Sequence, residues 1–431
     1  MGRPSFLRFL GDAGHGRESG VTRGGERASW SQLAAVGREL AREVDRDATY
    51  VVDPDAGLDS FAAYFAVASI PDTLLLWARP DHFPGQLTRL AAALYRASEE
   101  PRPPLTRPLW GTLTSGTAGT PKVPVGYADT MELLALHYQA ELYERLGAGG
   151  ETATTLATCL PLDYSAAFMM MVIPALFLRK DLLLFEPHDW RPLAAAAATE
   201  HVACLTTPGL AVAGAASLPQ AADFASVSLF MASGYLSTER IRTIRQVMTG
   251  VHMLNCYGAS ETGVVSLDRQ ATGAGHVGAP IAGKPTWIED PDAHGTGAIA
   301  TSGFDCREFY WPGRQPIRRP DGTVSVTDIG RFDEAGRLYL EGRLDSGEKL
   351  HGVTIYPRSI ERYLLTLDGV ADVKVFVRHD GGLDRLAARV VGRVDAATVR
   401  EHCAALSHLE QPALIECVPD TMHAYSGHGK L

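Results

Sequence analysis

The stretch from Thr49 to Trp77 reads TYVVDPDAGLDSFAAYFAVASIPDTLLLW and holds three segments of different texture. Residues 49–52 form a short run rich in β-branched and aromatic side chains, residues 57–68 favour a helix, and residues 73–77 are again apolar. Strand, helix and strand in this order are typical of a parallel sheet covered by helices. We therefore expect an α/β fold.

The alternation continues on both sides of this stretch. Before it, residues 30–44 carry Leu33, Val36, Leu40 and Val44 at helical spacing. After it we expect a helix around residues 131–146, a strand at 155–160, a helix after 165, and strands near 203 and 229. The central part of the chain is therefore predicted to be an α/β body.

The texture changes after about residue 298, where short β-like runs such as 323–326 and 338–341 are separated by Gly and Pro. A helix at 357–365 and a strand at 370–377 predict a small α+β module. With 431 residues, 45% of them hydrophobic, the chain exceeds what one compact core usually holds, so two or more domains are expected.

Charge and composition disfavour several classes of protein. A formal net charge of −10 without any basic block argues against a nucleic-acid-binding surface. The longest apolar run, residues 164–178, is too short to span a membrane and contains Pro174. No secretory signal is visible around Arg3, Arg8 and Asp12, so a cytoplasmic enzyme with small-molecule or protein partners is expected. The six scattered cysteines are expected to be reduced thiols.

A loop rich in small and hydroxyl-bearing residues, LTSGTAGTPKV, runs from Leu113 to Val123. Small residues let backbone N–H groups approach an anion, hydroxyls add donors and a lysine adds positive charge, which predicts a phosphate cradle. A Walker A loop is excluded because Pro121 precedes Lys122 and Val123 follows it. An ordinary surface loop is the alternative. The candidate ATP-binding residues here are Thr114, Ser115, Gly116, Thr117, Gly119 and Lys122.

A second motif, NCYGASE, runs from Asn255 to Glu261. Tyr257 can stack on a purine, Ser260 can donate to a phosphate, and Glu261 is a hard oxygen ligand suited to Mg²⁺. A hydrolase elbow of the form Gly-Xaa-Ser-Xaa-Gly would need glycine where Thr262 stands, which disfavours a serine nucleophile.

These two motifs resemble those of the superfamily of acyl-CoA synthetases, nonribosomal-peptide adenylation domains and luciferases. Its phosphate loop reads Thr-Ser-Gly-Thr-Thr-Gly-Xaa-Pro-Lys, from which the chain departs at Ala118, and its second motif reads Asn-Xaa-Tyr-Gly-Xaa-Thr-Glu. The resemblance implies that the loop holds the β- and γ-phosphates of ATP. It also places Ser233 and Gly234 beside the adenine and Gly258 in the ATP site.

The resemblance extends to TDIGR at 327–331, to Arg343 and to the terminal SGHGKL. It implies that Asp328 and Arg343 hold the ribose, and that Lys430 enters the site to stabilise charge between the acid and the α-phosphate. Taken alone, Asp328 and Arg343 are equally typical of a solvated surface pair. A penultimate lysine is equally typical of a frayed terminus.

The same resemblance implies the domain organisation. Residues 1–344 would form an adenylation core of helix-covered, mostly parallel sheets, with a shortened N-terminal subdomain. Residues 345–431 would form a small α+β lid domain that rotates about a hinge at Asp345, with Gly352 in the stretch that approaches a pantetheine thiol. Arg358 and Arg362 are candidates to contact an acidic carrier protein.

Asp163 and Tyr164 fall where this superfamily lines its acid pocket, and the resemblance adds Cys256. A carboxylate in an apolar pocket needs a cation or hydrogen-bond donors, so Asp163 favours an acid that bears an amine or a hydroxyl. The alternative is that Asp163 caps the helix that follows it.

The resulting expectation is a ligase that uses ATP and Mg²⁺ to convert a small carboxylic acid, aryl or amino-substituted, into an acyl adenylate. The acceptor would be coenzyme A or a phosphopantetheinyl carrier protein. Two alternatives remain open at this stage: a ligase with a nitrogen or oxygen acceptor, and a catalytically silent nucleotide-binding protein.

Overall fold

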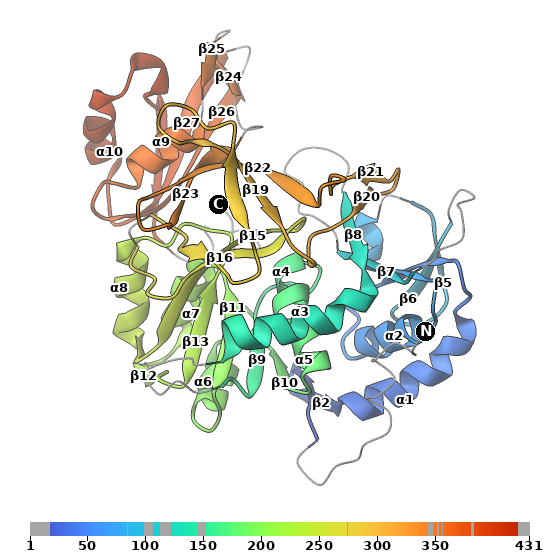
Figure 1. Cartoon of the computed structure of the whole chain (residues 1–431). Helices are drawn as coiled ribbons and strands as arrows, with labels where there is room; N and C mark the ends of the chain where they lie inside the picture. Colours follow the sequence, from blue (N-terminus) through green and yellow to red (C-terminus); the bar gives the residue numbers. More distant parts are fainter. Residues whose placement is uncertain are drawn as a thin grey trace.

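The computed structural model describes residues 18–83, 85–98, 107–112, 122–144, 152–273, 275–343, 348–350, 353–355, 357–380 and 383–420 (Figure 1). The first alternation is confirmed, since β3 (Thr49–Val52), α2 (Asp59–Ala68) and β4 (Leu74–Trp77) follow one another and β3 pairs with β4 in parallel. Helix α2 is buried along most of its length, as its apolar composition requires. The expected α/β class is confirmed.

The larger sheet has nine strands, and its central strands are parallel and fully buried, as expected when helices cover both faces. Antiparallel strands lie only at its two edges. In spatial order the strands are β17 (Ala279–Pro280), β16 (Gly263–Asp268), β15 (His252–Ala259), β13 (Val227–Met231), β11 (Val202–Thr206), β9 (Thr155–Thr158), β10 (Asp181–Leu184), β1 (Gly20–Arg23) and β2 (Glu26–Ser29).

The second sheet has eight strands, of which only β7, β4 and β3 run parallel to one another. The other pairings are antiparallel. In spatial order the strands are β21 (Gln315–Pro316), β20 (Phe309–Trp311), β8 (Val123–Tyr127), β7 (Leu109–Thr112), β4, β3, β6 (Leu94–Ala97) and β5 (Leu87–Arg89).

The helices are short, and among those described none has the length and apolar character needed to cross a membrane. They are α1 (Trp30–Leu40), α2, α3 (Met131–Tyr138), α4 (Ser165–Ala167), α5 (Ile173–Phe177), α6 (Arg191–Ala197), α7 (Pro208–Ser217), α8 (Thr238–Val247), α9 (Pro357–Leu364) and α10 (Ala396–His402). The helix expected after Ser165 consists of α4, a π-helical turn at Phe168–Val172 and α5, with Pro174 in the first turn of α5, where proline is tolerated.

Helix α1 shows how local sequence fixes an element. The Ser29 hydroxyl accepts from the Gln32 backbone N–H while the Gln32 side chain accepts from the Ser29 N–H, which closes a capping box. Gly37 packs so closely on α2 that an added Cβ would lie 2.6 Å from the Phe65 Cβ. The expectation that Val36 belongs to the buried face is wrong: its side chain is 49% exposed, because the buried stripe turns toward the small residues that let α1 approach α2.

One hydrophobic cluster extends between the two large sheets. Phe168, which follows the nine-stranded sheet's β9, lies against Trp77 and Trp110 of the eight-stranded sheet, with ring centroids 4.9 and 5.4 Å away. Burial of large aromatic rings is a major source of stabilisation, so these contacts fix the two sheets relative to each other.

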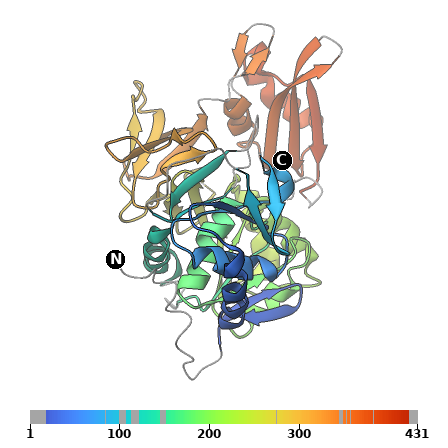
Figure 2. The ribbon, with the colours of Figure 1, turned by 90° about the vertical axis from the view of Figure 1, so that its right-hand side faces the viewer.

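The remaining strands form smaller sheets and a C-terminal unit that projects from the body (Figures 1 and 2). Its core, from Leu350 to Cys403, is a separate hydrophobic cluster. We propose that the boundary between the adenylation core and this C-terminal unit lies after residue 344, a position outside the described residues. The strands are β12 (Ala222–Asp223) with β14 (Met248–Thr249), then β18 (Thr286–Glu289), β19 (Gly297–Ser302), β22 (Thr323–Phe332) and β23 (Leu338–Arg343), and in the C-terminal unit β24 (Glu348–Leu350), β25 (Val353–Ile355), β26 (Val370–Asp380), β27 (Leu383–Gly392) and β28 (Leu414–Val418).

Ion pairs join the C-terminal unit to the body. Arg240 on α8 is 1% exposed, and its guanidinium lies 3.0 Å from Asp372 Oδ2 and 3.4 Å from Asp420 Oδ2. Burial raises the pKa of Asp372 despite this cation. A second contact joins Arg362 on α9 to Glu341 on β23. Ion pairs therefore contribute to holding the C-terminal unit against the body.

Candidate functional site

The candidate residues lie where strands of the two large sheets end. In a parallel sheet the carboxyl ends of neighbouring strands share one edge, and ligands of α/β proteins bind outside that edge. Asp163 follows β9 and Ser233 follows β13 in one sheet, while β7 ends at Thr112, directly before the predicted phosphate loop, in the other. The topology thus brings segments that are far apart in the chain to one region.

Tyr257, Asp328 and Arg343 form one cluster. The Tyr257 hydroxyl donates to Asp328 Oδ2 over 2.9 Å, and Arg343 Nε lies 3.8 Å from Asp328 Oδ1. Strand pairing sets this geometry, because Asp328 on β22 stands opposite Arg343 on β23. Burial raises the pKa of Tyr257 well above its ordinary value, so the phenol stays protonated and donates. Arg343 also donates to the Thr327 hydroxyl over 2.7 Å.

Ser260 and Glu261 lie on the tight turn between β15 and β16. The Ser260 hydroxyl is 2.7 Å from that of Ser165, and Glu261 Oε1 accepts from the Tyr310 hydroxyl over 2.7 Å. Gly258 is required by close packing, since an added Cβ would lie 2.2 Å from the Gly263 carbonyl oxygen. This close packing is a steric reason for glycine at position 258, and its place in the ATP site stays a prediction.

Lys122 approaches the same group from the eight-stranded sheet. Its ammonium lies 5.2 Å from the centre of the Tyr310 ring, within range of a cation–π contact. Burial and the neighbouring Glu261 carboxylate raise the pKa of Tyr310. Tyr310 thus contacts both the Lys122 ammonium of the phosphate loop and the Glu261 carboxylate of the second motif.

A buried charged network behind the turn was missed by the sequence analysis. The Lys284 ammonium bonds to the Thr262 carbonyl and to the Asp305 carboxylate, and both side chains of this ion pair are 2% exposed. The Arg307 backbone N–H donates to the Glu261 carbonyl over 2.8 Å. No motif pointed to these residues, and the only signal was the presence of charged residues inside otherwise apolar segments.

The Arg307 side chain is also buried. Its guanidinium lies 3.9 Å above the Trp110 ring and donates to the Asp305 carbonyl over 3.0 Å. Burial lowers the pKa of Arg307 to about 10, so the guanidinium remains charged at neutral pH. Lys284, Asp305 and Arg307 together hold the backbone that carries Glu261.

The predicted acid-pocket residues lie next to the predicted adenine loop. The Tyr164 hydroxyl contacts the Ser233 hydroxyl, and burial raises the pKa of Tyr164. Ser233 has φ +58°, and Gly234 packs against Pro208 at 3.0 Å from an added Cβ. Cys256 is buried on β15, and burial raises the pKa of its thiol, so it acts as a small apolar side chain.

Asp163 is not a helix cap, because the N-cap of α4 is Tyr164. Its carboxylate, 8% exposed, instead lies 3.3 Å from the guanidinium of Arg79, which follows β4. The sequence analysis did not identify Arg79, since nothing near it in the chain marks it as a partner for a residue more than eighty positions away.

Several predicted residues lie outside the described residues, and their roles stay predictions. They are Thr114, Ser115, Gly116, Thr117 and Gly119 of the phosphate loop, Asp345 of the hinge, Gly352 and the terminal Lys430.

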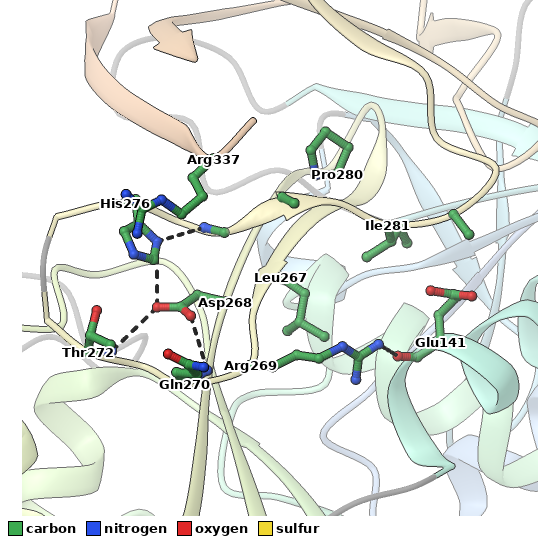
Figure 3. A pocket seen from close by; sticks show the side chains of 13 residues that line it. Glu141, Leu267, Asp268, Arg269, Gln270, Thr272, His276, Pro280, Ile281 and Arg337 are labelled. Carbon is green, nitrogen blue, oxygen red and sulfur yellow. Dashed lines mark hydrogen bonds and ion pairs between the residues drawn. The ribbon is translucent and has the colours of Figure 1, made fainter. Parts of the chain in front are cut away.

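A cavity of about 500 Å³ lies elsewhere, beyond the far end of β16 (Figure 3). In it His276 Nδ1 lies 3.6 Å from Asp268 Oδ2 and accepts from the Gly278 N–H, and Arg269 donates to the Glu141 carbonyl. None of the residues predicted above to bind ATP or the acid lines it. We therefore place the candidate site at the turn that carries Glu261.

The chain has relatives among known families and curated proteins. Residues 32–311 match the family model of the AMP-binding enzymes, a range that contains both of the motifs quoted first. The chain is 27% identical over 308 residues to an indoleacetate–CoA ligase of Aromatoleum aromaticum, which covers 68% of this chain and 58% of the relative. It is 31% identical over 193 residues to a 3-hydroxybenzoate–CoA ligase of Aromatoleum sp., covering 41% of this chain and 36% of the relative.

A further relative is the L-proline–carrier protein ligase of Streptomyces coelicolor, 28% identical over 187 residues, with 38% of this chain and 35% of the relative covered. The chain thus spans between about a third and three fifths of the length of these curated relatives.

Solved structures agree on the fold. ATP-bound MatB from Rhodopseudomonas palustris superposes with a TM-score of 0.71 at 16% identity, covering 100% of this chain and 97% of that one. The o-succinylbenzoate coenzyme A synthetase MenE from Bacillus subtilis, in complex with AMP, gives 0.70 at 15% identity, covering 99% and 97%. The motifs, the fold and the family match agree: the chain belongs to the AMP-binding enzymes, in the superfamily of adenylate-forming enzymes.

Proposed function

We propose that this chain uses ATP to activate a small carboxylic acid, aryl or amino-substituted, and transfers the acyl group to the thiol of coenzyme A or of a carrier protein. The observation that carries this proposal is the meeting of two clusters on one β-hairpin. Tyr257 with Asp328 and Arg343 lies near the end of its first strand, and Ser260 with Glu261, Tyr310 and Lys122 lies at its turn. The curated relatives, named as CoA ligases and as a carrier-protein ligase, support the same activity.

The Tyr257 cluster suits a ribose. The Asp328 side chain is 25% exposed and oriented by Tyr257 and Arg343, so its carboxylate can accept hydrogen bonds from sugar hydroxyls. The adjoining Arg343, 38% exposed, can still reach a ligand. Beside it, the backbone around Ser233 and Gly234 would accommodate the base.

The Glu261 carboxylate suits Mg²⁺. This ion usually keeps several waters and binds through one or two carboxylates together with substrate phosphates. In the described part of the chain no three His, Cys, Asp or Glu side chains gather to hold a metal by themselves, so a magnesium ion here would be shared with ATP. When bound, the ion would supply charge neutralisation for the phosphates.

The residues of this chain then have separate tasks in the first half-reaction. An oxygen of the acid attacks the α-phosphorus, the bond to pyrophosphate breaks, and an acyl adenylate forms. We assign to Ser260 a hydrogen bond to the α-phosphate and to Lys122 a contact with the leaving pyrophosphate. To Lys430, which lies outside the described residues, we assign stabilisation of the developing negative charge. In the second half-reaction a thiol attacks the acyl carbon and AMP leaves.

Acid-dependent release of pyrophosphate from ATP tests the proposal. We expect Glu261→Gln to lower the rate by at least about 100-fold, equivalent to about 2.7 kcal/mol, because the metal-binding charge is lost. Glu289→Gln is the matched control, since this carboxylate pairs with Arg319 on the surface of another sheet. Equal activity of both variants would contradict the role of Glu261.

The role of Lys430 is tested separately. Lys430→Ala should lower acid-dependent pyrophosphate release by about 100-fold, while Arg400→Ala, which removes an exposed cation of α10, should leave it unchanged. Full activity of the Lys430 variant would remove this lysine from the proposed site.

The acceptor is identified from the products. With the acid that gives pyrophosphate release, mass spectrometry should find a thioester when coenzyme A or a phosphopantetheinylated carrier protein is added. An amide or ester formed from a nitrogen or oxygen acceptor, without any thioester, would instead assign the alternative acceptor class.

A further inference from the structure

Asp163 ends a chain of alternating charges that crosses from one large sheet to the other. Arg79 Nε lies 3.3 Å from Asp163 Oδ2 and 2.9 Å from Asp55 Oδ2, and Arg23 Nη2 lies 3.7 Å from Asp55 Oδ1. Asp163 is the most buried of these groups, with 9% of its side chain exposed against 32% for Arg79 and 44% for Asp55. Starting from Asp163, the charges along this chain of contacts are negative, positive, negative and positive, in the order Asp163, Arg79, Asp55, Arg23.

The inner end of this chain lies in the candidate site. The two residues after Asp163 contact residues of the candidate site. The Tyr164 hydroxyl contacts the Ser233 hydroxyl, and the Ser165 hydroxyl lies 2.7 Å from that of Ser260. Arg79 reaches Asp163 from the eight-stranded sheet. It follows β4, which pairs with β7, the strand that leads into the phosphate loop.

A buried carboxylate is stable as an anion only if a cation or several donors compensate it. A protein that binds an ammonium-bearing acid can leave this compensation to the ligand. Here the guanidinium of Arg79 already stands beside Asp163, and a second cation at the same carboxylate would meet like-charge repulsion from Arg79.

On the basis of the proposed function, we propose that Arg79 is a specificity-determining residue. It neutralises Asp163 from within the protein and thereby selects acids that carry no ammonium group on the side facing Asp163. Among the two substrate classes of the proposed function, this selects aryl acids, including those whose aromatic amine is uncharged at neutral pH, over α-amino acids.

Matched pairs of acids that differ by one ammonium group test this proposal. Suitable pairs are 3-phenylpropanoate with L-phenylalanine and indole-3-propanoate with L-tryptophan, with benzoates and aminobenzoates as a further panel. The measured quantity is the ratio of kcat/KM for the ammonium-bearing acid to that for its partner, from pyrophosphate release. We expect the wild-type protein to favour the acids without ammonium.

Arg79→Gln should raise this ratio by at least about tenfold, because Asp163 then lacks its internal cation and an ammonium can replace it. Arg79→Lys keeps the charge and should keep the wild-type ratio. The double variant Arg79→Gln, Asp163→Asn removes both charges, so no carboxylate is left without a cation. It should therefore favour the acids without an ammonium group, as the wild-type protein does. Arg23→Gln is the matched control, since Arg23 pairs with Asp55, the next group along the chain of charges after Arg79.

The outcomes separate the two proposals. A wild-type preference for ammonium-bearing acids, or an unchanged ratio in Arg79→Gln, overturns the role of Arg79 while the ligase activity stands. Absence of acid-dependent pyrophosphate release from the wild-type protein across all panels overturns the proposed function, and with it the role of Arg79.

Discussion

Tyr310 contacts two charged groups that arrive from different parts of the chain. Its hydroxyl holds Glu261 over 2.7 Å, and its ring faces the Lys122 ammonium at 5.2 Å. Sequence motifs assigned the lysine and the glutamate but not the tyrosine, because nothing in the sequence around β20 marks Tyr310 as a partner of either. At the scale of single residues the sequence therefore predicts which groups are needed, while the groups that orient them emerge only from the fold.

Tyr310→Phe keeps the ring and removes the hydroxyl. Since a hydrogen bond to a charged group contributes about 1.5–3 kcal/mol, we expect kcat/KM for MgATP to fall by about tenfold. Pyrophosphate release at varied MgATP measures this change. Tyr95→Phe, on β6 of the same sheet, should leave the value unchanged; an equal loss in both variants would point to a general effect on stability.

His252 gives a pH-dependent contribution to stability. Its Nδ1 lies 3.2 Å from the Ser228 hydroxyl, and burial lowers its pKa below the ordinary 6.5. The unfolded chain therefore takes up a proton before the folded one does as the pH falls. The contribution is fully present above pH 6.5 and is lost as the pH falls from there through the lower pKa of the folded protein.

His252→Asn should accordingly reduce the loss of stability between pH 7.5 and pH 5.5, measured by urea unfolding at roughly these two values. His294→Asn, in the loop where Asp292 accepts from the His294 backbone N–H, should retain the wild-type dependence. A steeper loss in His252→Asn would show that the sign is wrong.

At the scale of elements, the hairpin of β15 and β16 carries most of the site, and a buried ion pair supports its turn. The five strands expected in the two large sheets lie within a few residues of β3, β4, β9, β11 and β13, because apolar runs determine them locally. It could not predict the support by Lys284 and Asp305. Both come from the segments that follow β17 and β19, and only the folded sheet brings them behind Thr262.

Lys284→Met should destabilise the protein by about 3–5 kcal/mol, because it leaves the Asp305 carboxylate buried without its cation. Lys284→Met with Asp305→Leu removes both charges and should recover most of this loss. Urea unfolding measures both variants. Arg337→Met breaks a surface pair with Asp333 and should cost less than about 1 kcal/mol. A loss of less than about 1 kcal/mol in Lys284→Met would contradict this prediction and show that water reaches the Lys284–Asp305 pair.

At the scale of the whole molecule, the C-terminal unit contacts the body through Arg240, whose two carboxylate partners are Asp372 on β26 and Asp420 after β28. The change of texture after residue 298 predicted a separate module, and its expected helix and strand correspond to α9 and β26. The ionic contact was not predictable, since Arg240 belongs to an ordinary amphipathic helix.

Arg240→Ala should loosen this contact, at a cost of about 3–5 kcal/mol if both carboxylates stay buried. We expect a larger radius of gyration in small-angle scattering and separate unfolding of the two parts. Arg242→Ala is the control on the same helix, because Arg242 is 56% exposed and pairs only locally with Glu239. Its effect should stay within about 0.5 kcal/mol. Identical scattering of both variants would exclude Arg240 as a determinant of the arrangement.

The position of Tyr310 has one more consequence. Because it stands on a strand of the eight-stranded sheet and holds a side chain of the nine-stranded sheet, a relative displacement of the two sheets would misalign Lys122 and Glu261 together. The Phe168 aromatic contacts with Trp77 and Trp110 oppose such a displacement. The aromatic core between the two sheets therefore contributes to the site at a distance, because it helps to keep the spacing of these two charged groups constant.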